Sequence, residues 1–361
     1  MLSERKRKIL QAVVGENIKN AEPISSKVIQ ERFFSDLSSA TIRNDLMNLE
    51  EMGYLFQPHT SSGRVPTAEG FKKYIEELMP ERELSSHEIM SLKKGFDEKI
   101  SGIEDLAKIT ASAISDATSY ASVVYMGALS EAIIESIKIV KILPTSCLVV
   151  VVTDLGIIKD LMIETDEDIT EEDCLSASRL LTDLLHDRLI VDLSGEEVTH
   201  ELSMVATRWR KMFDMVIEAI QNRSEKEIVE MDGASNLLSQ PEYSSKEKMS
   251  QMIKLFETKD VLAPLLSTGN DLEISFHVGS DELNGCSVVS ANYKINGKNV
   301  GKAGVIGPVR MDYAKAVSVL KEVSQTIQEQ FGNSKKGIQN NKQNKYISRR
   351  KEQKNERKSP K

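Results

Sequence analysis

Residues that build metal, thiol and aromatic sites are scarce in this chain. Its 361 residues include only 3 cysteines, 5 histidines and 1 tryptophan, and aromatic residues make up 5%. The cysteines, at positions 147, 174 and 286, form no CxxC pair, and the histidines form no HExxH motif or Cys/His cluster. We therefore expect no metal site and no disulfide framework. The hydrophobic cores should be aliphatic and filled with methionine.

Long apolar runs and catalytic motifs are also lacking. The longest apolar run, Cys147–Val152, is far too short to span a bilayer. The N-terminus is basic, but charged residues and Gln11 interrupt any apolar stretch there, so it does not resemble an export signal. No nucleophile elbow occurs, and no motif sets a histidine against a serine or cysteine. We expect a cytoplasmic protein that is not an enzyme, spans no membrane and needs no cofactor.

Charge is unevenly distributed along the chain. Residues 1–79 carry 11 lysines and arginines against 11 aspartates and glutamates, whereas residues 333–361 carry 11 against 2. Since the whole chain has a net charge of −8, residues 80–332 carry −17. An acidic body is repelled by DNA, so a nucleic-acid contact is expected at the N-terminal part.

The segment SSATIRNDLMNLEEMGYLFQPHTSSGRVP, residues 38–66, is typical of a recognition helix followed by a hairpin. Ser38 is a suitable N-cap, and Ile42, Leu46 and Leu49 fall on one stripe that must face a core. The opposite side and its flanks carry small, amide and basic side chains. Asparagine can pair with adenine and arginine with guanine, so the first two turns suit a major groove.

The residues around this helix complete a winged helix-turn-helix. An amphipathic helix precedes Pro23, and a short helix capped by Ser25 or Ser26 ends near Phe33. Tyr54–Gln57 and Arg64–Pro66 are expected to form hairpin strands around the wing loop. The alternative is a winged helix that binds protein, with its polar groups merely solvated.

Two sets of side chains are predicted to contact DNA. Those expected to read bases are Ala40, Thr41, Arg43 and Asn44. The second set, with Gly63 at the wing tip, is expected to contact the sugar-phosphate backbone of the DNA: Lys27, Ser38, Ser39, His59, Thr60, Ser61, Ser62 and Arg64.

The chain resembles the HrcA family of bacterial heat-inducible transcription repressors. The resemblance rests on LSERKRKIL, EPISSKVI, the segment from residue 38 through KKYIEELM, and the downstream GVIGPVRMDYAKAV. It runs from residue 2 to about residue 331. Ser25 departs from the family pattern, which has glycine at that place, but serine is also a good N-cap.

The middle of the chain predicts an α+β fold. Apolar runs at 118–127, 136–143 and 145–164, with a turn at Asp154-Leu155-Gly156, indicate one group of antiparallel strands. A second group surrounds Asn296-Gly297, a strong hairpin signal. Between the groups the pattern is helical, which indicates an insertion. An apolar helix face is expected there from Leu175, Leu180, Leu181, Leu184 and Leu185.

The expected organisation is therefore multidomain. A winged helix-turn-helix in residues 1–79 is followed by a linker or connecting helix in 80–100. The resemblance implies a GAF-like domain in 101–165 and 236–332, interrupted at 166–235 by a mainly helical insertion that serves dimerisation; covering the sheet is the other possible role of these helices. The tail, 333–361, is rich in Lys, Asn and Gln and should be disordered. It is either a sequence-independent nucleic-acid arm or a solvated extension.

The resemblance also implies a function. A homodimer would bind an inverted-repeat operator of the CIRCE type, repress chaperone genes and be released on heat stress, with a GroE-type chaperonin as modulator. In a bacterial cytoplasm such a protein is nucleoid-associated when bound. The alternative is a metabolite-sensing winged-helix regulator with its ligand in the GAF-like domain. The run GKNVGKAGVIGPVR does not fit a phosphate loop, because neither lysine is followed by Ser or Thr. Arg310, just before a helix, could hold an anion there, although a structural role is the stronger interpretation.

Overall fold

The computed structural model describes residues 2–59, 62–97, 103–127, 132–165, 167–194, 212–218, 220, 227–257, 266, 274–279, 285–295 and 298–331. Among these residues no helix is both long and apolar enough to cross a membrane. The basic tail, the turn Asn296-Gly297, and Thr60 and Ser61 of the predicted wing lie outside the described residues.

Residues 2–79, which the sequence predicts to bind DNA and which we call the DNA-binding unit, have the predicted succession of three helices and a hairpin. Its elements are α1 (Glu4–Asn20), α2 (Ser26–Phe33), α3 (Ser39–Glu51), β1 (Leu55–Phe56), β2 (Val65–Pro66) and α4 (Ala68–Glu77). Ser25 and Ser38 cap α2 and α3, and Thr67 caps α4. In each case the side-chain oxygen accepts a hydrogen bond from a backbone N–H that the helix leaves unpaired.

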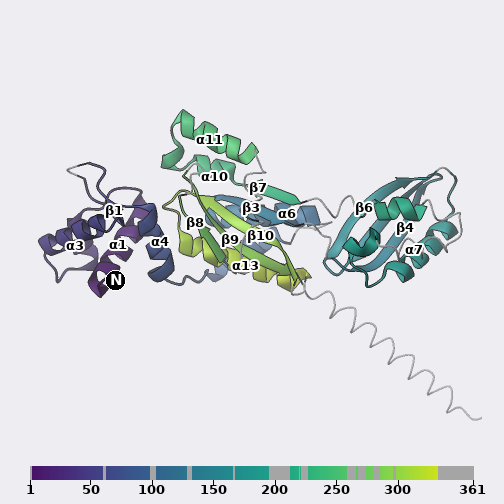
Figure 1. Cartoon of the computed structure of the whole chain (residues 1–361), viewed down its shortest axis with the longest axis horizontal. Helices are drawn as coiled ribbons and strands as arrows, with labels where there is room; N and C mark the ends of the chain where they lie inside the picture. The colour runs from purple at the N-terminus through teal and green to yellow at the C-terminus, as the bar shows by residue number, and fades with distance from the viewer. Residues whose placement is uncertain are drawn as a thin grey trace, which may run out of the picture.

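A five-stranded antiparallel sheet forms the centre of the molecule (Figure 1). Its strand order is β7-β3-β10-β9-β8, and the strands are β3 (Ala121–Met126), β7 (Ile228–Asp232), β8 (Ile274–His277), β9 (Ser287–Ile295) and β10 (Lys298–Gly307). The helices α6 (Ile103–Thr118) and α13 (Tyr313–Phe331) pack on one face. The other face packs on α10 (Ala234–Leu238), η3 (Pro241–Tyr243) and α11 (Lys246–Glu257). Helix α5 (Ser86–Gly95) lies in the predicted linker and contacts α6.

A second, separate sheet corrects the expected organisation. β4 (Ile134–Leu143), β5 (Ser146–Thr153) and β6 (Gly156–Glu164) pair only with one another among the described strands. They pack on α7 (Glu171–Leu185), which is followed by η2 (Ile190–Ser194), and on residues 212–218 and 220 in a core of their own. We predicted that 101–165 and 236–332 would together form one GAF-like domain and that the insertion at 166–235 would be mainly helical. Instead the chain leaves the central sheet after β3 and returns at β7, so the segment between them contains a sheet as well as helices.

The two sheets lie in different parts of the elongated molecule, with the DNA-binding unit at the far end from β4–β6 (Figure 1). The core of the DNA-binding unit is continuous with that of the central sheet, because buried residues from α1 to α13 belong to one apolar cluster. Cys147, Cys174 and Cys286 are buried and unpaired with each other. Burial raises the pKa of the Cys147 thiol to about 11, which makes it a poor nucleophile at neutral pH.

Candidate nucleic-acid interface

Helix α3 presents the side chains that the sequence assigns to DNA. Ile42, Leu46 and Leu49 are buried, as predicted, and hold the helix against α1 and α2. Ala40, Arg43 and Asn44 are exposed on the other side, and Met47 is 45% exposed. Burial of one stripe therefore fixes which residues α3 offers to a partner.

The hydroxyl groups at the beginning of α3 bond within the protein. Ser38 Oγ accepts a hydrogen bond from the Thr41 N–H at 3.1 Å and lies 2.9 Å from Thr41 Oγ1. Ser39 Oγ lies 3.1 Å from Ser26 Oγ, which joins α3 to α2. These three residues of α3 set the position of the helix, and their hydroxyls are already partly satisfied.

An ion pair between a buried carboxylate and a half-exposed arginine anchors α3 to α1. Asp45 is only 3% exposed, and its carboxylate accepts hydrogen bonds from Arg5 Nε at 2.7 Å and Nη2 at 3.2 Å. A second buried carboxylate, Glu16 of α1, pairs with Arg32 of α2. We did not predict these pairs. The available signal was Asp45 itself, because a charged residue on the apolar side of a helix must find a partner.

The wing is held close to the chain that precedes α2. Backbone hydrogen bonds of 2.9 Å run in both directions between Ile24 and Arg64. A Cβ atom on Gly63 would lie 2.3 Å from the Ile24 carbonyl carbon, so this approach needs glycine. Gly63 thus has a structural reason to stand at the predicted tip.

The residues predicted to contact the DNA backbone from the wing and α2 divide into those that bond within the protein and those that are exposed. Ser62 Oγ donates to the His59 carbonyl at 2.7 Å and accepts from its N–H at 3.0 Å, so it closes the loop. Arg64 Nε donates to Glu50 at 2.8 Å, and the Arg64 side chain is 14% exposed, which ties the wing to the end of α3. His59 is exposed. On α2, the Lys27 side chain is 76% exposed and lies 3.7 Å from Glu31.

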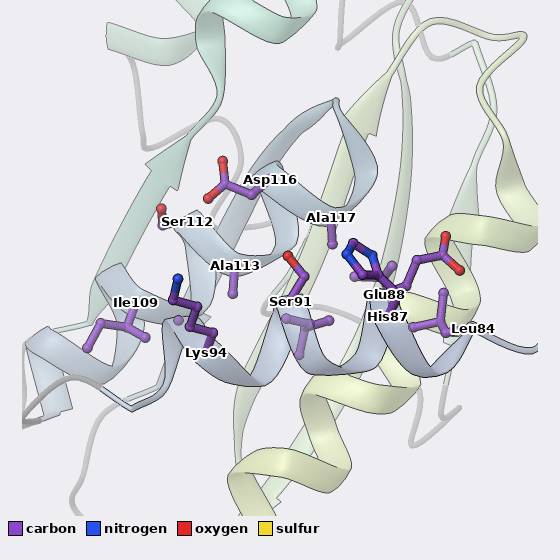
Figure 2. A pocket seen from close by; sticks show the side chains of 13 residues that line it. Leu84, His87, Glu88, Ser91, Lys94, Ile109, Ser112, Ala113, Asp116 and Ala117 are labelled. Atoms are coloured by element: carbon purple, nitrogen blue, oxygen red, sulfur yellow. The ribbon is translucent and has the colours of Figure 1, made fainter.

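A pocket lies outside this interface, between α5 and α6 (Figure 2). Its volume is about 510 Å³. Leu92, Ala113 and Val319 supply apolar lining, and Lys94 and Asp116 supply charges of opposite sign. A second carboxylate of the lining, that of Glu88, pairs with Arg82. Neither Lys94 nor Asp116 forms an ion pair with another described residue. The pocket could therefore accommodate a small molecule with both an anionic and a cationic group.

The described residues contain no group of three or more His, Cys, Asp or Glu side chains arranged to hold a metal ion. The chemistry that the N-terminal elements offer is recognition: an exposed guanidinium and an exposed amide on a helix held rigidly from behind.

A helix-turn-helix with an exposed, amide- and arginine-bearing third helix followed by a hairpin defines a class of transcription regulators. Residues 104–317 match the family model described as the HrcA protein C terminal domain. The chain is 33% identical to the heat-inducible transcription repressor HrcA of Pelotomaculum thermopropionicum, over 91% of this chain and 97% of that protein. The chain belongs to the HrcA family of heat-inducible transcription repressors.

A second relative agrees with this assignment, and a solved structure shares the fold. The heat-inducible transcription repressor HrcA of Carboxydothermus hydrogenoformans is 32% identical, over 92% of this chain and 99% of its own length. A crystal structure of a hypothetical protein at 2.2 Å resolution has a TM-score of 0.61 at 22% identity, and covers 92% of this chain and 98% of the other. That structure supports the fold.

Proposed function

We propose that this chain represses heat-shock (chaperone) genes by binding, as a homodimer, an inverted-repeat operator of the CIRCE type. The observation that carries the proposal is the exposed face of α3, with Ala40, Arg43 and Asn44 at its centre. Its backing by buried Ile42 and by the Arg5–Asp45 ion pair makes this face rigid. Rigid presentation lowers the entropic cost of binding.

The role proposed for each predicted contact residue depends on whether its side chain is exposed or already forms hydrogen bonds within the protein. Arg43 and Asn44 read base edges, and Ala40 allows close approach to the groove. Lys27 and His59 contact phosphates, because they are exposed on elements flanking α3. Ser38, Ser39, Thr41, Ser62 and Arg64 act mainly by positioning, since their side chains bond within the unit. Thr60 and Ser61 remain predicted contacts of the wing.

The homodimer is proposed to form through β4–β6, in the segment between β3 and β7. One side of this sheet packs on α7. The other side, the open sheet face, carries Val140, Leu148, Val150, Val152 and Met162, together with the exposed Lys138 opposite Val150. Val140 is 50% and Met162 is 58% exposed. An apolar sheet face of this kind is typical of an interaction site.

A GroE-type chaperonin is proposed as modulator. The central sheet, which we assign as the GAF-like domain, pairs β3 with β7 about 100 residues downstream and with β10 nearly 180 residues downstream. Such non-local pairing folds slowly and exposes strand edges on the way. A repressor that needs the chaperonin to fold would fall in activity when heat diverts the chaperonin to other clients.

The proposal is tested by fluorescence anisotropy. A labelled inverted-repeat duplex and a scrambled duplex of the same composition are titrated with the full chain over a salt series, with and without chaperonin. We expect binding to the repeat to be about 1,000-fold tighter, as for other specific DNA-binding proteins, and to persist as salt rises. Equal affinities that collapse together with salt would contradict an operator-specific repressor.

A second candidate function, metabolite sensing, is favoured by the pocket between α5 and α6. α5 follows the DNA-binding unit, so a ligand there could alter how that unit is held. Free amino acids, which carry both charges, are suitable probes. An amino acid that binds, present at a concentration 100 times its dissociation constant, should stabilise the fold by about 2.7 kcal/mol and raise the melting temperature. Lys94→Ala should abolish this rise in melting temperature. No shift for any amino acid in the full set would exclude this ligand class.

A further inference from the structure

The turn that joins β10 to α13, residues 308–312, connects the DNA-binding unit to the rest of the molecule. Arg310 in this turn is 13% exposed at its side chain. Its guanidinium pairs with the carboxylate of Glu242 in η3 and donates to Gln240 Oε1 at 3.1 Å. Its Nη1 also donates to the backbone carbonyl of Ile18 at 3.3 Å. One side chain thus bridges three segments that are far apart in sequence.

The contact with Ile18 is a helix cap supplied from outside the helix. Ile18 lies in the last turn of α1, where carbonyl oxygens lack intrahelical partners and the helix dipole is negative. A cation placed there is stabilising. Arg310 therefore fixes the end of α1, which in turn holds α3 through the Arg5–Asp45 ion pair.

Asp312 of the same turn and two residues in the first turns of α13 hold the next segment of the DNA-binding unit and the linker. Asp312 accepts a hydrogen bond from Arg82 of the linker at 2.9 Å. The ring of Tyr313 lies 6.0 Å, centroid to centroid, from that of Phe71 in α4. Ser318 of α13 donates to the carbonyl oxygen of Arg82. The unit is thus attached at α1, at α4 and just after its last helix.

We infer that Arg310 is a positioning residue for operator recognition: it holds the DNA-binding unit at one orientation on the central sheet. The inference rests on the proposed function, in which two such units read two half-sites. Half-sites lie about one helical turn apart, so each added base pair rotates one half-site by roughly 36°. Two rigidly held units then accept one separation only, whereas loosely attached units accept several.

Arginine suits this position better than lysine. Its planar guanidinium presents several N–H donors in a fixed fork, which here serve Glu242, Gln240 and Ile18 at once. Lysine keeps the charge but cannot reach all three acceptors. Arg310→Lys and Arg310→Ala are therefore informative as a pair, and Lys321→Ala, an exposed cation on α13, is the matched control.

Orientation is measured without DNA by pulsed electron spin resonance. Cysteines introduced at the exposed positions Glu51 of α3 and Gln325 of α13 carry the spin labels, and the buried native cysteines should stay unlabelled. Labelled full-length chain is diluted with unlabelled chain so that distances within one chain dominate. We expect a narrow distance distribution for the parent chain and for Lys321→Ala. Both Arg310 variants should broaden it while circular dichroism stays native.

DNA selectivity is measured with inverted-repeat duplexes whose central spacer is lengthened or shortened by one or two base pairs. The parent chain should lose at least about tenfold in affinity on each altered spacer, and Arg310→Ala less than about threefold, since its units can adapt. A distribution that stays narrow in both Arg310 variants would overturn the inference. So would a broadened distribution with unchanged spacer preference.

Failure of the proposed function has a different signature. If the Arg310 variants broaden the distance distribution but neither they nor the parent chain distinguish the inverted repeat from a scrambled duplex, operator recognition is refuted. The role of Arg310 in holding the DNA-binding unit would then stand on the distance measurement alone.

Discussion

Arg43→Ala is expected to abolish most of the sequence preference of DNA binding while the fold stays intact. Arg43 is exposed on α3 and forms no ion pair with another described residue, so its loss breaks no ion pair in the part of the chain that the structure describes. A bidentate arginine–guanine contact contributes about 1–3 kcal/mol of discrimination. A two-fold symmetric dimer makes the contact twice, so the preference for operator over scrambled duplex should fall by about 30-fold or more.

A comparison with Lys27→Ala separates base reading from phosphate contact. Loss of a phosphate contact from each protomer weakens binding to both duplexes alike and lowers the salt slope of the dimer by about 2. Arg43→Ala should instead lower mainly the affinity for the operator. Arg179→Ala, an exposed arginine on α7, is the matched control and should change neither quantity. If Arg43→Ala preserved both affinity and preference, α3 would not be the recognition helix as we have assigned it.

The DNA-binding unit could be predicted closely because its signals are local. Ser38 caps α3, Ile42 and Leu49 are buried, and the two strands of the hairpin pair as expected, although each is only two residues long. Helical spacing and capping chemistry are properties of neighbouring residues, which a sequence displays directly. What it did not display was the partner of Asp45, since Arg5 is 40 residues away.

Sheet membership could not be predicted in the same way. Alternating apolar residues indicate that β4, β5 and β6 are strands, and the turn at Asp154–Gly156 indicates that β5 and β6 pair. Nothing in a strand states which sheet it joins, because every backbone offers the same hydrogen-bonding groups. Side-chain burial against α7 decides it. The expected apolar face of α7 was also too broad, since Leu175 and Leu180 are 53% and 39% exposed.

Arg310 illustrates how far local reasoning reaches. Its place just before a helix indicated that it could hold an anion, and a structural role was favoured over binding of an external ligand. The anion it meets is the carboxylate of Glu242, 68 residues earlier in the chain. A sequence can show that a cation needs a partner, but long-range packing selects it.

Met162→Lys is expected to convert the dimer to a monomer and so to weaken operator binding by at least about 100-fold. Met162 lies on the edge strand β6 of the open sheet face and is aligned with Leu148 of β5 and Val140 of β4. In a two-fold interface the introduced charge appears twice, and each copy is removed from water without a partner. Burying such a charge costs several kcal/mol.

The same change should leave the folded chain stable. The Met162 side chain is 58% exposed in the isolated chain, so a lysine there keeps its ammonium group in water while its methylenes cover the sheet. Met90→Lys is the matched control, because Met90 is 69% exposed on α5, away from the open sheet face. Sedimentation velocity over a concentration series should find dimers for the parent chain and for Met90→Lys.

Operator affinity then links assembly to recognition. Monomers must bind each half-site independently, and they lose the effective concentration that joins two weak contacts into one tight one. Met162→Lys should therefore bind a single half-site as well as the parent chain does, but should lose the gain on the full inverted repeat. If Met162→Lys remained a dimer at the concentrations where the parent chain is one, the open sheet face would not be the interface, and the exposed side chains of α7 would be the next surface to alter.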